Sequence, residues 1–234
     1  MAIVGAEGSN VPAITLYIAP GSCSRVPLIA LCEIGVAFDT ALVRFMRGEH
    51  KSSAYKEVNP KGKVPALVVG GNALTENVAI LSFLNRMYPA AGLLPAAATP
   101  MDEARQIADL SFCSSTLHPI VTRIRMPAFF AAPEAAPDVW EKGCAAMHEY
   151  FQLIENRLVN SPWWYGETWS VMDAYLNWVF WRVEGADFPV SDFPHFADHS
   201  RRIAVRPSFV QAMEIEAQAN TLLEAKGLAI KPPS

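Results

Sequence analysis

Hydrophobic and polar residues alternate with two different periodicities along the chain, and the periodicity changes near residue 95. Before that point, short apolar runs with the composition of strands alternate with longer stretches of helical periodicity. The predicted strands cover residues 14–18, 38–43, 66–69 and 73–74, and the predicted helices cover 24–34 and 76–88. Beyond residue 95 the spacing is helical almost throughout, over residues 100–126, 134–160, 171–184, 193–205 and 207–225. The pattern therefore predicts a βαβ unit, a ββα unit and then an all-helical half.

Turn and cap residues support these boundaries. Gly70-Gly71-Asn72 is a hairpin signal between the last two strands. The run Thr99-Pro100-Met101-Asp102 reads as a helix start, with an N-cap threonine and a proline at the first helical position. Pro119 falls inside the helix that follows, so we expect a kink there. We expect a leader over residues 1–12, an α/β domain over 13–92, a linker over 93–98 and an all-helical domain over 99–234.

Composition narrows the class of protein without naming a function. The chain has 234 residues, of which 51% are hydrophobic and 18% charged, as expected for a compact fold. A net charge of −4 gives no electrostatic reason to expect nucleic acid or an anionic membrane as partner. No apolar run approaches the roughly 18 residues of a membrane span, and the first dozen residues do not resemble a signal peptide. The four cysteines are widely spaced, which predicts reduced thiols, a cytoplasmic location and no metal site.

Four short motifs carry the functional prediction, and they read APGSCSRVPLIAL (19–31), NPKGKVPAL (59–67), LTENVAI (74–80) and SVMDAY (170–175). Together they resemble the glutathione transferase family, in particular its bacterial beta class, and the resemblance runs from about residue 14 to 225. It implies a thioredoxin-like α/β domain followed by an all-α domain, assembled as a homodimer. It also implies a detoxifying enzyme that activates glutathione for attack on a small apolar electrophile. Other glutathione-dependent reactions (ether cleavage, dehalogenation, isomerisation or thiol transfer), a non-enzymatic carrier of apolar ligands and a structural module remain alternatives.

Val64-Pro65 and Glu76-Asn77 are the predicted contacts for glutathione. The resemblance implies a cis bond before Pro65, which would turn the backbone of Val64 outward to pair with the cysteinyl unit of glutathione. Asn77 at a helix start suits the γ-glutamyl carboxylate, and Glu76 suits the ammonium group beside it. An ordinary trans proline at a strand edge and a plain helix cap are the structural alternatives.

The glycyl carboxylate of glutathione needs a cation. Residues 44–51 form a locally basic segment that flanks the site in the family. We expect Arg47 or Lys51 to supply this contact, with Lys63 as the next candidate. A solvated basic loop would have the same composition.

Cys23 raises the question of whether its thiol reacts, binds or packs. Its place at a predicted helix start favours the thiolate and lowers a thiol pKa, and Arg25 would act in the same sense. A two-cysteine redox cycle is excluded, because the resolving position is occupied by Val26. The resemblance places the Cys23 thiol beside the sulfur of glutathione, with Ser24 as a neighbouring hydroxyl donor. The alternative is a small buried residue.

The helical half supplies the remaining candidates. Ser115-Thr116-Leu117-His118 resembles the beta-class stretch whose histidine reaches over the thiol, although Pro119 stands where lysine is usual. Ser170 and Asp173 form a capping box, to which we assign no chemistry. An apolar acceptor pocket would use aromatic and methionine side chains, which could equally be core. The expected acceptor residues are Phe112, Thr122, Met126, Phe129 and Phe130, with Trp178 and Trp181 as further candidates.

Overall fold

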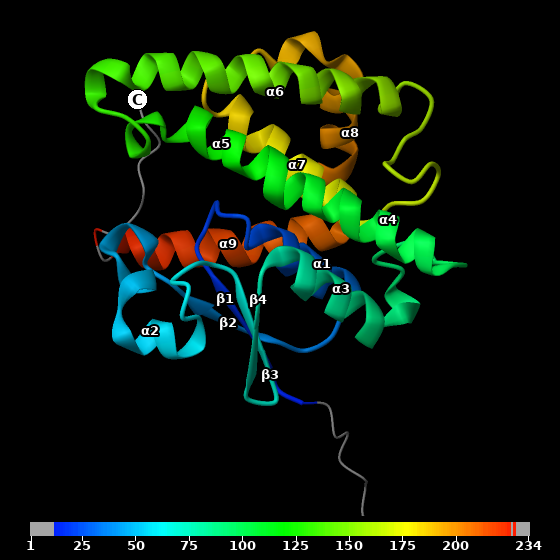
Figure 1. The fold of residues 1–234 in the computed structure, drawn as a ribbon. Helices are drawn as coiled ribbons and strands as arrows, with labels where there is room; N and C mark the ends of the chain where they lie inside the picture. The colour runs from blue at the N-terminus through cyan, green and yellow to red at the C-terminus, as the bar shows by residue number, and fades with distance from the viewer. Residues whose placement is uncertain (1–11, 226, 228–234) are drawn as a thin grey trace, which may run out of the picture.

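A four-stranded mixed sheet forms the centre of the first half of the molecule (Figure 1). The computed structural model describes residues 12–225 and residue 227. The strands are β1 (Ile14–Ile18), β2 (Asp39–Leu42), β3 (Ala66–Val69) and β4 (Asn72–Thr75). Their order is β2-β1-β3-β4, with β1 parallel to β2 and the other two pairs antiparallel. Of the predicted leader, residues 1–11 lie outside the described residues.

The helices of this half follow from the residues around the strands. Helix α1 (Arg25–Ile34) makes the crossover between β1 and β2, as a parallel pair requires. It ends at Gly35, whose φ of 72° is the left-handed conformation that glycine adopts easily. Helix α3 (Asn77–Met87) follows β4, so the predicted βαβ and ββα units are confirmed. The sequence pattern missed α2 (Ser53–Val58), because six residues with one buried side chain, Tyr55, show no periodicity.

The second half is helical, as predicted. Its longest helix, α6, lies along one edge of the molecule in Figure 1, and α7 lies between it and the sheet domain. Residues 171–180 of α7 are all buried, so this helix is the core around which the half is built. A capping box joins Ser170 and Asp173 at its start, as the sequence indicates. The elements are α4 (Pro100–Ser111), a π-helix (Phe112–Leu117), α5 (His118–Arg125), α6 (Ala136–Leu158), α7 (Val171–Glu184), α8 (Pro194–Ala204) and α9 (Pro207–Ala225).

The prediction of a single long helix over residues 100–126 is wrong. It is divided by the π-helix, in which the N–H of His118 donates to the carbonyl of Cys113 five residues earlier. Pro119 is the second residue of α5. The expected irregularity is present, but it begins before the proline. A proline has no N–H to donate, and a π turn is one way for a helix to accommodate such a gap.

Helix α9 returns from the helical half and lies against α1 (Figure 1). A buried ion pair joins them: Arg25 Nη2 lies 2.7 Å from Glu216 Oε2, and both side chains are at most 7% exposed. The start of α1 is therefore held between the two halves. Within the described ranges, no helix is both long and apolar enough to span a bilayer.

Candidate functional site

Three segments that are far apart in the sequence meet where β1 turns into α1. The thiol of Cys23 points at the carbonyl oxygen of Val64, with 3.6 Å between sulfur and oxygen. The side-chain amide of Asn77 donates to the carbonyl of Cys23 at 3.0 Å. The predicted association of Cys23, Val64 and the start of α3 is therefore present in the fold.

Ser24 closes the turn before α1. Its hydroxyl oxygen accepts from the N–H of Ala19 and lies 3.2 Å from the Ala19 carbonyl, to which it can donate. It also lies 2.8 Å from the hydroxyl of Ser22, and the residue is 1% exposed. This geometry corrects the prediction that Ser24 is a hydroxyl donor to glutathione, because its hydrogen bonds serve the turn.

The Cys23 thiol is buried, which overrides its position at a helix start. Burial raises the pKa of Cys23 to about 12, and the charge of Glu76 adds to the rise, while the backbone N–H and the charges of Lys63 and Arg182 oppose it. The expectation of a lowered pKa is therefore wrong. Arg25, which was expected to help, is instead bound to Glu216. At neutral pH the Cys23 sulfur carries its proton and can act as a hydrogen-bond donor.

The bond between Val64 and Pro65 is cis, as the family resemblance implies. The loop before it is anchored, because the Lys63 carbonyl accepts from the Tyr55 hydroxyl at 2.7 Å and from the Asn59 amide at 2.6 Å. Among the described residues, none forms a main-chain hydrogen bond with Val64. The Val64 backbone is thus available to an extended peptide.

Glu76 has a φ of 75°, a conformation that non-glycine residues rarely adopt outside functional sites. Its exposed carboxylate lies 2.6 Å from Lys61 Nζ, a partner that the sequence analysis did not identify. Asn77, the first residue of α3, is buried, and its side chain is occupied by the Cys23 carbonyl. The side-chain amide is therefore taken up within the fold, and the backbone N–H of Asn77, at a helix start, is left to meet a carboxylate.

The three predicted cations differ in their relation to this cluster. Arg47 and Lys51 lie exposed in the 3-10 turns after β2. Lys63 is also exposed, and its charge lowers the pKa of both Cys23 and His118. Of the three predicted cations, Lys63 is thus the one whose charge acts on the Cys23 thiol.

His118 approaches the same turn from the helical half. Its ring meets Trp178 edge to face, with 4.7 Å between centroids, and the Trp178 indole donates to the Gly21 carbonyl at 3.3 Å. Burial, with help from Lys63 and Arg182, lowers the pKa of His118 to about 4. The imidazole is therefore neutral at pH 7 and can accept a hydrogen bond.

The predicted acceptor residues do not gather into a pocket. Phe112 packs against Tyr150 and Trp164, with ring centroids 5.6 and 6.4 Å away, and belongs to the core of the helical half. Phe129 and Phe130 are 64% and 49% exposed, after α5. The Thr122 hydroxyl donates to the His118 carbonyl of its own helix, and Met126 caps α5. None of these residues lines the cavity between the two halves.

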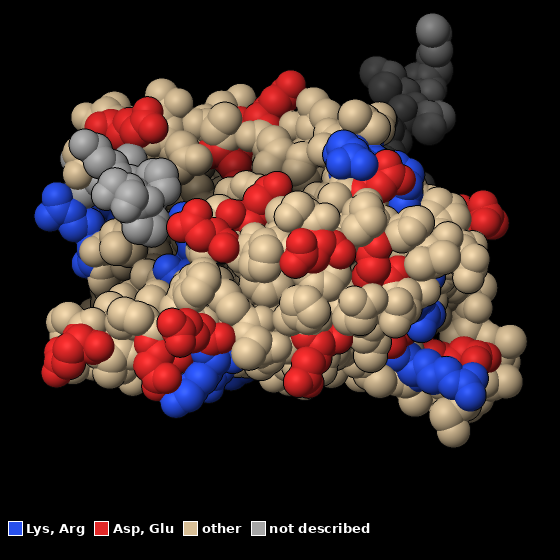
Figure 2. Space-filling view, turned by 90° about the horizontal axis from the view of Figure 1, so that it is seen from above, with Lys and Arg blue, Asp and Glu red and all other residues tan. Residues whose placement is uncertain are grey.

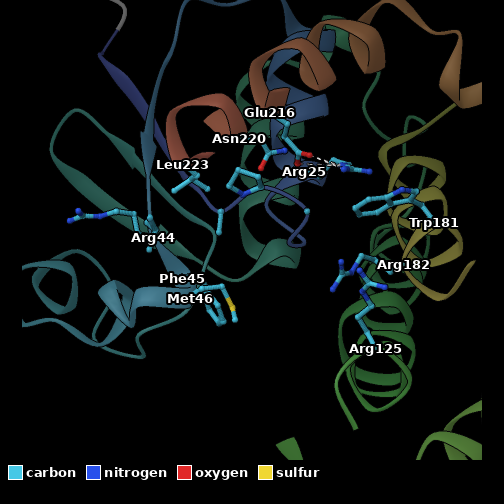
Figure 3. Close-up of a pocket in the computed structure, with 14 residues that line it drawn as sticks. Arg25, Arg44, Phe45, Met46, Arg125, Trp181, Arg182, Glu216, Asn220 and Leu223 are labelled. Carbon is cyan, nitrogen blue, oxygen red and sulfur yellow. Dashed lines mark hydrogen bonds and ion pairs between the residues drawn. The ribbon is translucent and has the colours of Figure 1, made fainter. Parts of the chain in front are cut away.

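That cavity has a volume of about 230 Å³ and borders the β1–α1 turn (Figure 3). A methyl group added to Gly21 would lie 3.5 Å from the Trp181 ring and 3.9 Å from Arg182 Nη1. Trp181 and Arg182 therefore face the turn at a position two residues before Cys23 in the sequence. Of the two candidate tryptophans, Trp181 lines the cavity and Trp178 is buried. The lining that sequence reasoning missed comprises Ala19, Pro20, Gly21, Arg25, Val43, Arg44, Phe45, Met46, Arg125, Arg182, Glu216, Asn220 and Leu223.

Comparison with known proteins agrees with this architecture. Residues 12–86 match the model of the glutathione S-transferase N-terminal domain, and residues 116–207 match that of the C-terminal domain. The chain is 30% identical to glutathione S-transferase GstA of Escherichia coli O157:H7 over 203 residues, which cover 86% of this chain and 98% of GstA. It is 33% identical to a maleylpyruvate isomerase of a Ralstonia species over 156 residues, 63% of this chain and 71% of that protein.

Solved structures give the same result. The beta-class glutathione S-transferase of Sphingomonas chungbukensis aligns with a TM-score of 0.76 and 32% identity over 86% of this chain and 98% of its own. A glutathione transferase homologue from Sulfitobacter, with bound glutathione, aligns with a TM-score of 0.78 and 25% identity over 87% and 98%. The chain belongs to the glutathione S-transferase family.

Proposed function

We propose that this glutathione transferase binds glutathione where the β1–α1 turn, the cis Val64-Pro65 bond and the start of α3 meet. The observation that carries the proposal is the convergence of Cys23, the strained Glu76 and the Val64 backbone, which has no main-chain partner among the described residues. In this arrangement Val64 pairs with the cysteinyl backbone of glutathione. Glu76 and the N–H of Asn77 receive its γ-glutamyl ammonium and carboxylate, and Lys63 faces its glycyl carboxylate.

The chemistry follows from the charge states of the site. The thiol of glutathione loses its proton and its sulfur attacks an electrophilic carbon, with departure of a leaving group or addition to a double bond. The neutral imidazole of His118 can accept a hydrogen bond from the glutathione thiol, but its low pKa makes it a poor base, so the thiol proton passes to solvent. Protonated Cys23 donates a hydrogen bond to the glutathione sulfur, and the positive charge of Lys63 stabilises the thiolate.

Assembly and location are further parts of this proposal. Met46, Met101 and Ile107 are 52%, 60% and 49% exposed, on the segment after β2 and on α4. Exposed apolar side chains of this kind suit packing across a two-fold axis, so we assign the protein as a homodimer. We place it in the cytoplasm, where its four free cysteines stay reduced.

Isomerisation is the second candidate, and the similarity to the Ralstonia isomerase favours it. Addition of glutathione to a double bond, rotation and elimination would return the glutathione unchanged. Consumption of glutathione with a given substrate therefore separates transfer from isomerisation.

Titration calorimetry of Glu76→Gln tests the glutathione site. The substitution keeps the shape and removes the charge that pairs with the γ-glutamyl ammonium. We expect glutathione to bind about 10-fold more weakly, the low end of what a charge-assisted hydrogen bond contributes. The matched control is Glu141→Gln on the exposed face of α6, which should bind as the parent protein does. Equal affinity in all three proteins would remove the site as described.

A further inference from the structure

The cavity beside Cys23 combines apolar residues with four arginines, which the sequence did not lead us to expect there. Arg25, Arg44, Arg125 and Arg182 line it, and Glu216 is its one lining carboxylate among the described residues. This is a local excess of positive charge in a chain whose net charge is −4. The outer face that carries α6 shows the opposite balance, with mostly Asp and Glu among its charged side chains (Figure 2).

Two of the four guanidinium groups are already neutralised. Arg25 pairs with Glu216 at 2.7 Å, and Arg44 pairs with Glu49 at 2.8 Å. Arg125 and Arg182 have no carboxylate partner in the described part of the chain. Arg125 donates to the carbonyl of Gly185, which leaves its other donors free for a ligand.

Arg182 is held in an unfavourable setting. Burial, and then the charges of Arg125 and Arg25, lower its pKa to about 10. Its Nε is buried and has no hydrogen-bond partner within the described residues. Like charges in a partly desolvated cavity repel each other, and an anion placed between them would remove that cost. A guanidinium offers two parallel donors that match a carboxylate.

The residues of the cavity walls indicate the shape and size of the rest of the ligand. Figure 3 shows Trp181, Arg182 and Arg125 on one side of an open space, with Phe45 and Met46 on the other. The Trp181 ring is fixed from one side by the Arg25 guanidinium, 3.7 Å from its centroid. A flat body suits this ring. The 230 Å³ volume is below the roughly 300–1,000 Å³ of sites for drug-sized ligands, so the ligand is small.

We propose that this cavity is an acceptor subsite for a small, flat electrophile that carries a carboxylate, bound by Arg125 and Arg182. The inference rests on the proposed function, since it places the electrophilic carbon beside glutathione at Cys23. It replaces the apolar acceptor expected from the sequence. For an aryl chloride the step is balanced: a carbon–sulfur bond forms, chloride leaves with the bonding electron pair, and the thiol proton passes to solvent.

The glycyl carboxylate of glutathione is the other possible source of such an anion. The cavity lining contains none of Lys63, Val64, Glu76 and Asn77, the residues that carry the proposed glutathione site. We therefore assign the arginines to the acceptor. The experiment below includes an arm that separates the two sources.

The test uses 4-chloro-3,5-dinitrobenzoate and its methyl ester, which differ in charge and share a reacting carbon. With each rate corrected for the uncatalysed reaction, we expect kcat/KM to be at least about 10-fold higher for the acid at pH 7. Arg182→Met should reduce this preference to less than about threefold, mainly through KM. The control is Arg201→Met on α8, whose side chain is 71% exposed and paired with Asp198. It should keep the preference.

Two binding measurements complete the test. Calorimetry of the unaltered protein without glutathione should show 3-nitrobenzoate binding at least about 10-fold more tightly than 3-nitrobenzamide, a comparison that needs no variant. Glutathione and its glycyl ethyl ester should each bind Arg182→Met as they bind the parent protein.

The outcomes separate the two proposals. Equal binding of nitrobenzoate and nitrobenzamide, or an acid preference that survives Arg182→Met, overturns the carboxylate subsite and leaves the transferase proposal standing. Loss of glutathione affinity in Arg182→Met, but not of affinity for the ethyl ester, overturns it in favour of the glycyl carboxylate. Selective nitrobenzoate binding in a protein that does not bind glutathione supports the subsite and removes the proposed glutathione site.

Discussion

The two sides of the interdomain site depend on different structural features. On the proposed glutathione side, the determinants are backbone features within short stretches of sequence: a cis bond at Val64-Pro65, a positive φ at Glu76 and the first turn of α3. On the proposed acceptor side, the determinants are side-chain charges that come from α1, α5, α7, α9 and the segment after β2. Such backbone geometry requires particular residues at consecutive positions, so it can be recognised as a sequence motif. A cluster of arginines from three helices and the segment after β2 leaves no such motif.

The ion pairs of the two sides differ in the same way. Arg25–Glu216 on the acceptor side is at most 7% exposed, whereas Lys61–Glu76 on the glutathione side is 52% and 63% exposed. Burial makes a broken pair costly, and exposure makes it cheap. The acceptor wall should therefore depend on its charges for stability, and the glutathione side should not.

The largest expected effect is on the buried pair. Arg25→Met leaves Glu216 buried without its partner, and we expect the free energy of unfolding to fall by about 3–5 kcal/mol. The double variant Arg25→Met/Glu216→Leu removes both charges and should recover most of that loss. Urea unfolding of both variants and the parent protein measures this. A loss of less than about 1 kcal/mol in Arg25→Met would mean that the two sides do not differ in the way described.

The next effect is on Cys23, where the two sides meet. A pKa of about 12, against 9.0 for an unperturbed thiol, leaves much less thiolate at neutral pH. We expect alkylation by iodoacetamide at pH 7.5 to be at least about 100-fold slower than for free cysteine, and to accelerate up to pH 9. Peptide mass spectrometry of quenched samples gives the rates. A rate that levels off below pH 9 would show that Lys63 and Arg182 outweigh burial and hold a thiolate.

The smallest effect is expected at Lys61. Lys61→Ala removes an exposed partner of Glu76, so the free energy of unfolding should change by less than about 0.5 kcal/mol. Glutathione affinity should change by less than about threefold, because Glu76 keeps its backbone-determined position. Urea unfolding and calorimetry, run beside Glu76→Gln, check both values. A larger loss of affinity than in Glu76→Gln would identify Lys61 itself as a glutathione contact.

The sequence predicts those features of this molecule that are decided locally. The buried alternation of β1, the capping boxes at Thr99 and Ser170 and the limits of α7 all follow from neighbouring residues. Ser24 could not be assigned in this way, because whether its hydroxyl faces the ligand or the Ala19 backbone depends on how the turn closes. Phe112 is a similar case. Helical spacing shows that such a residue faces inward, but not whether its neighbour is a ligand or Trp164.

The proposed acceptor cavity is harder still to predict, because its arginines are distinguished by the absence of carboxylate partners. Arg182 and Arg206 both lie in or next to predicted helices, and neither sequence context shows whether the arginine has an acidic partner. In the fold, Arg206 pairs with Glu33 at 2.6 Å, while Arg182 has no acidic partner in the described residues. Such a difference is a property of three-dimensional pairing and is absent from composition or spacing.

The π-helix before His118 has a consequence for how residues of this region are matched between relatives. Its wider turns take up more residues than regular α-helical turns of the same rise, and each residue of an α-helix advances the side-chain direction by about 100°. The side chains of α5 therefore emerge at a different angular phase from the one that counting along α4 would give. His118 meets Trp178 in this shifted phase. An alignment that treats residues 100–126 as one uninterrupted helix would assign the neighbours of Trp178 to the wrong positions.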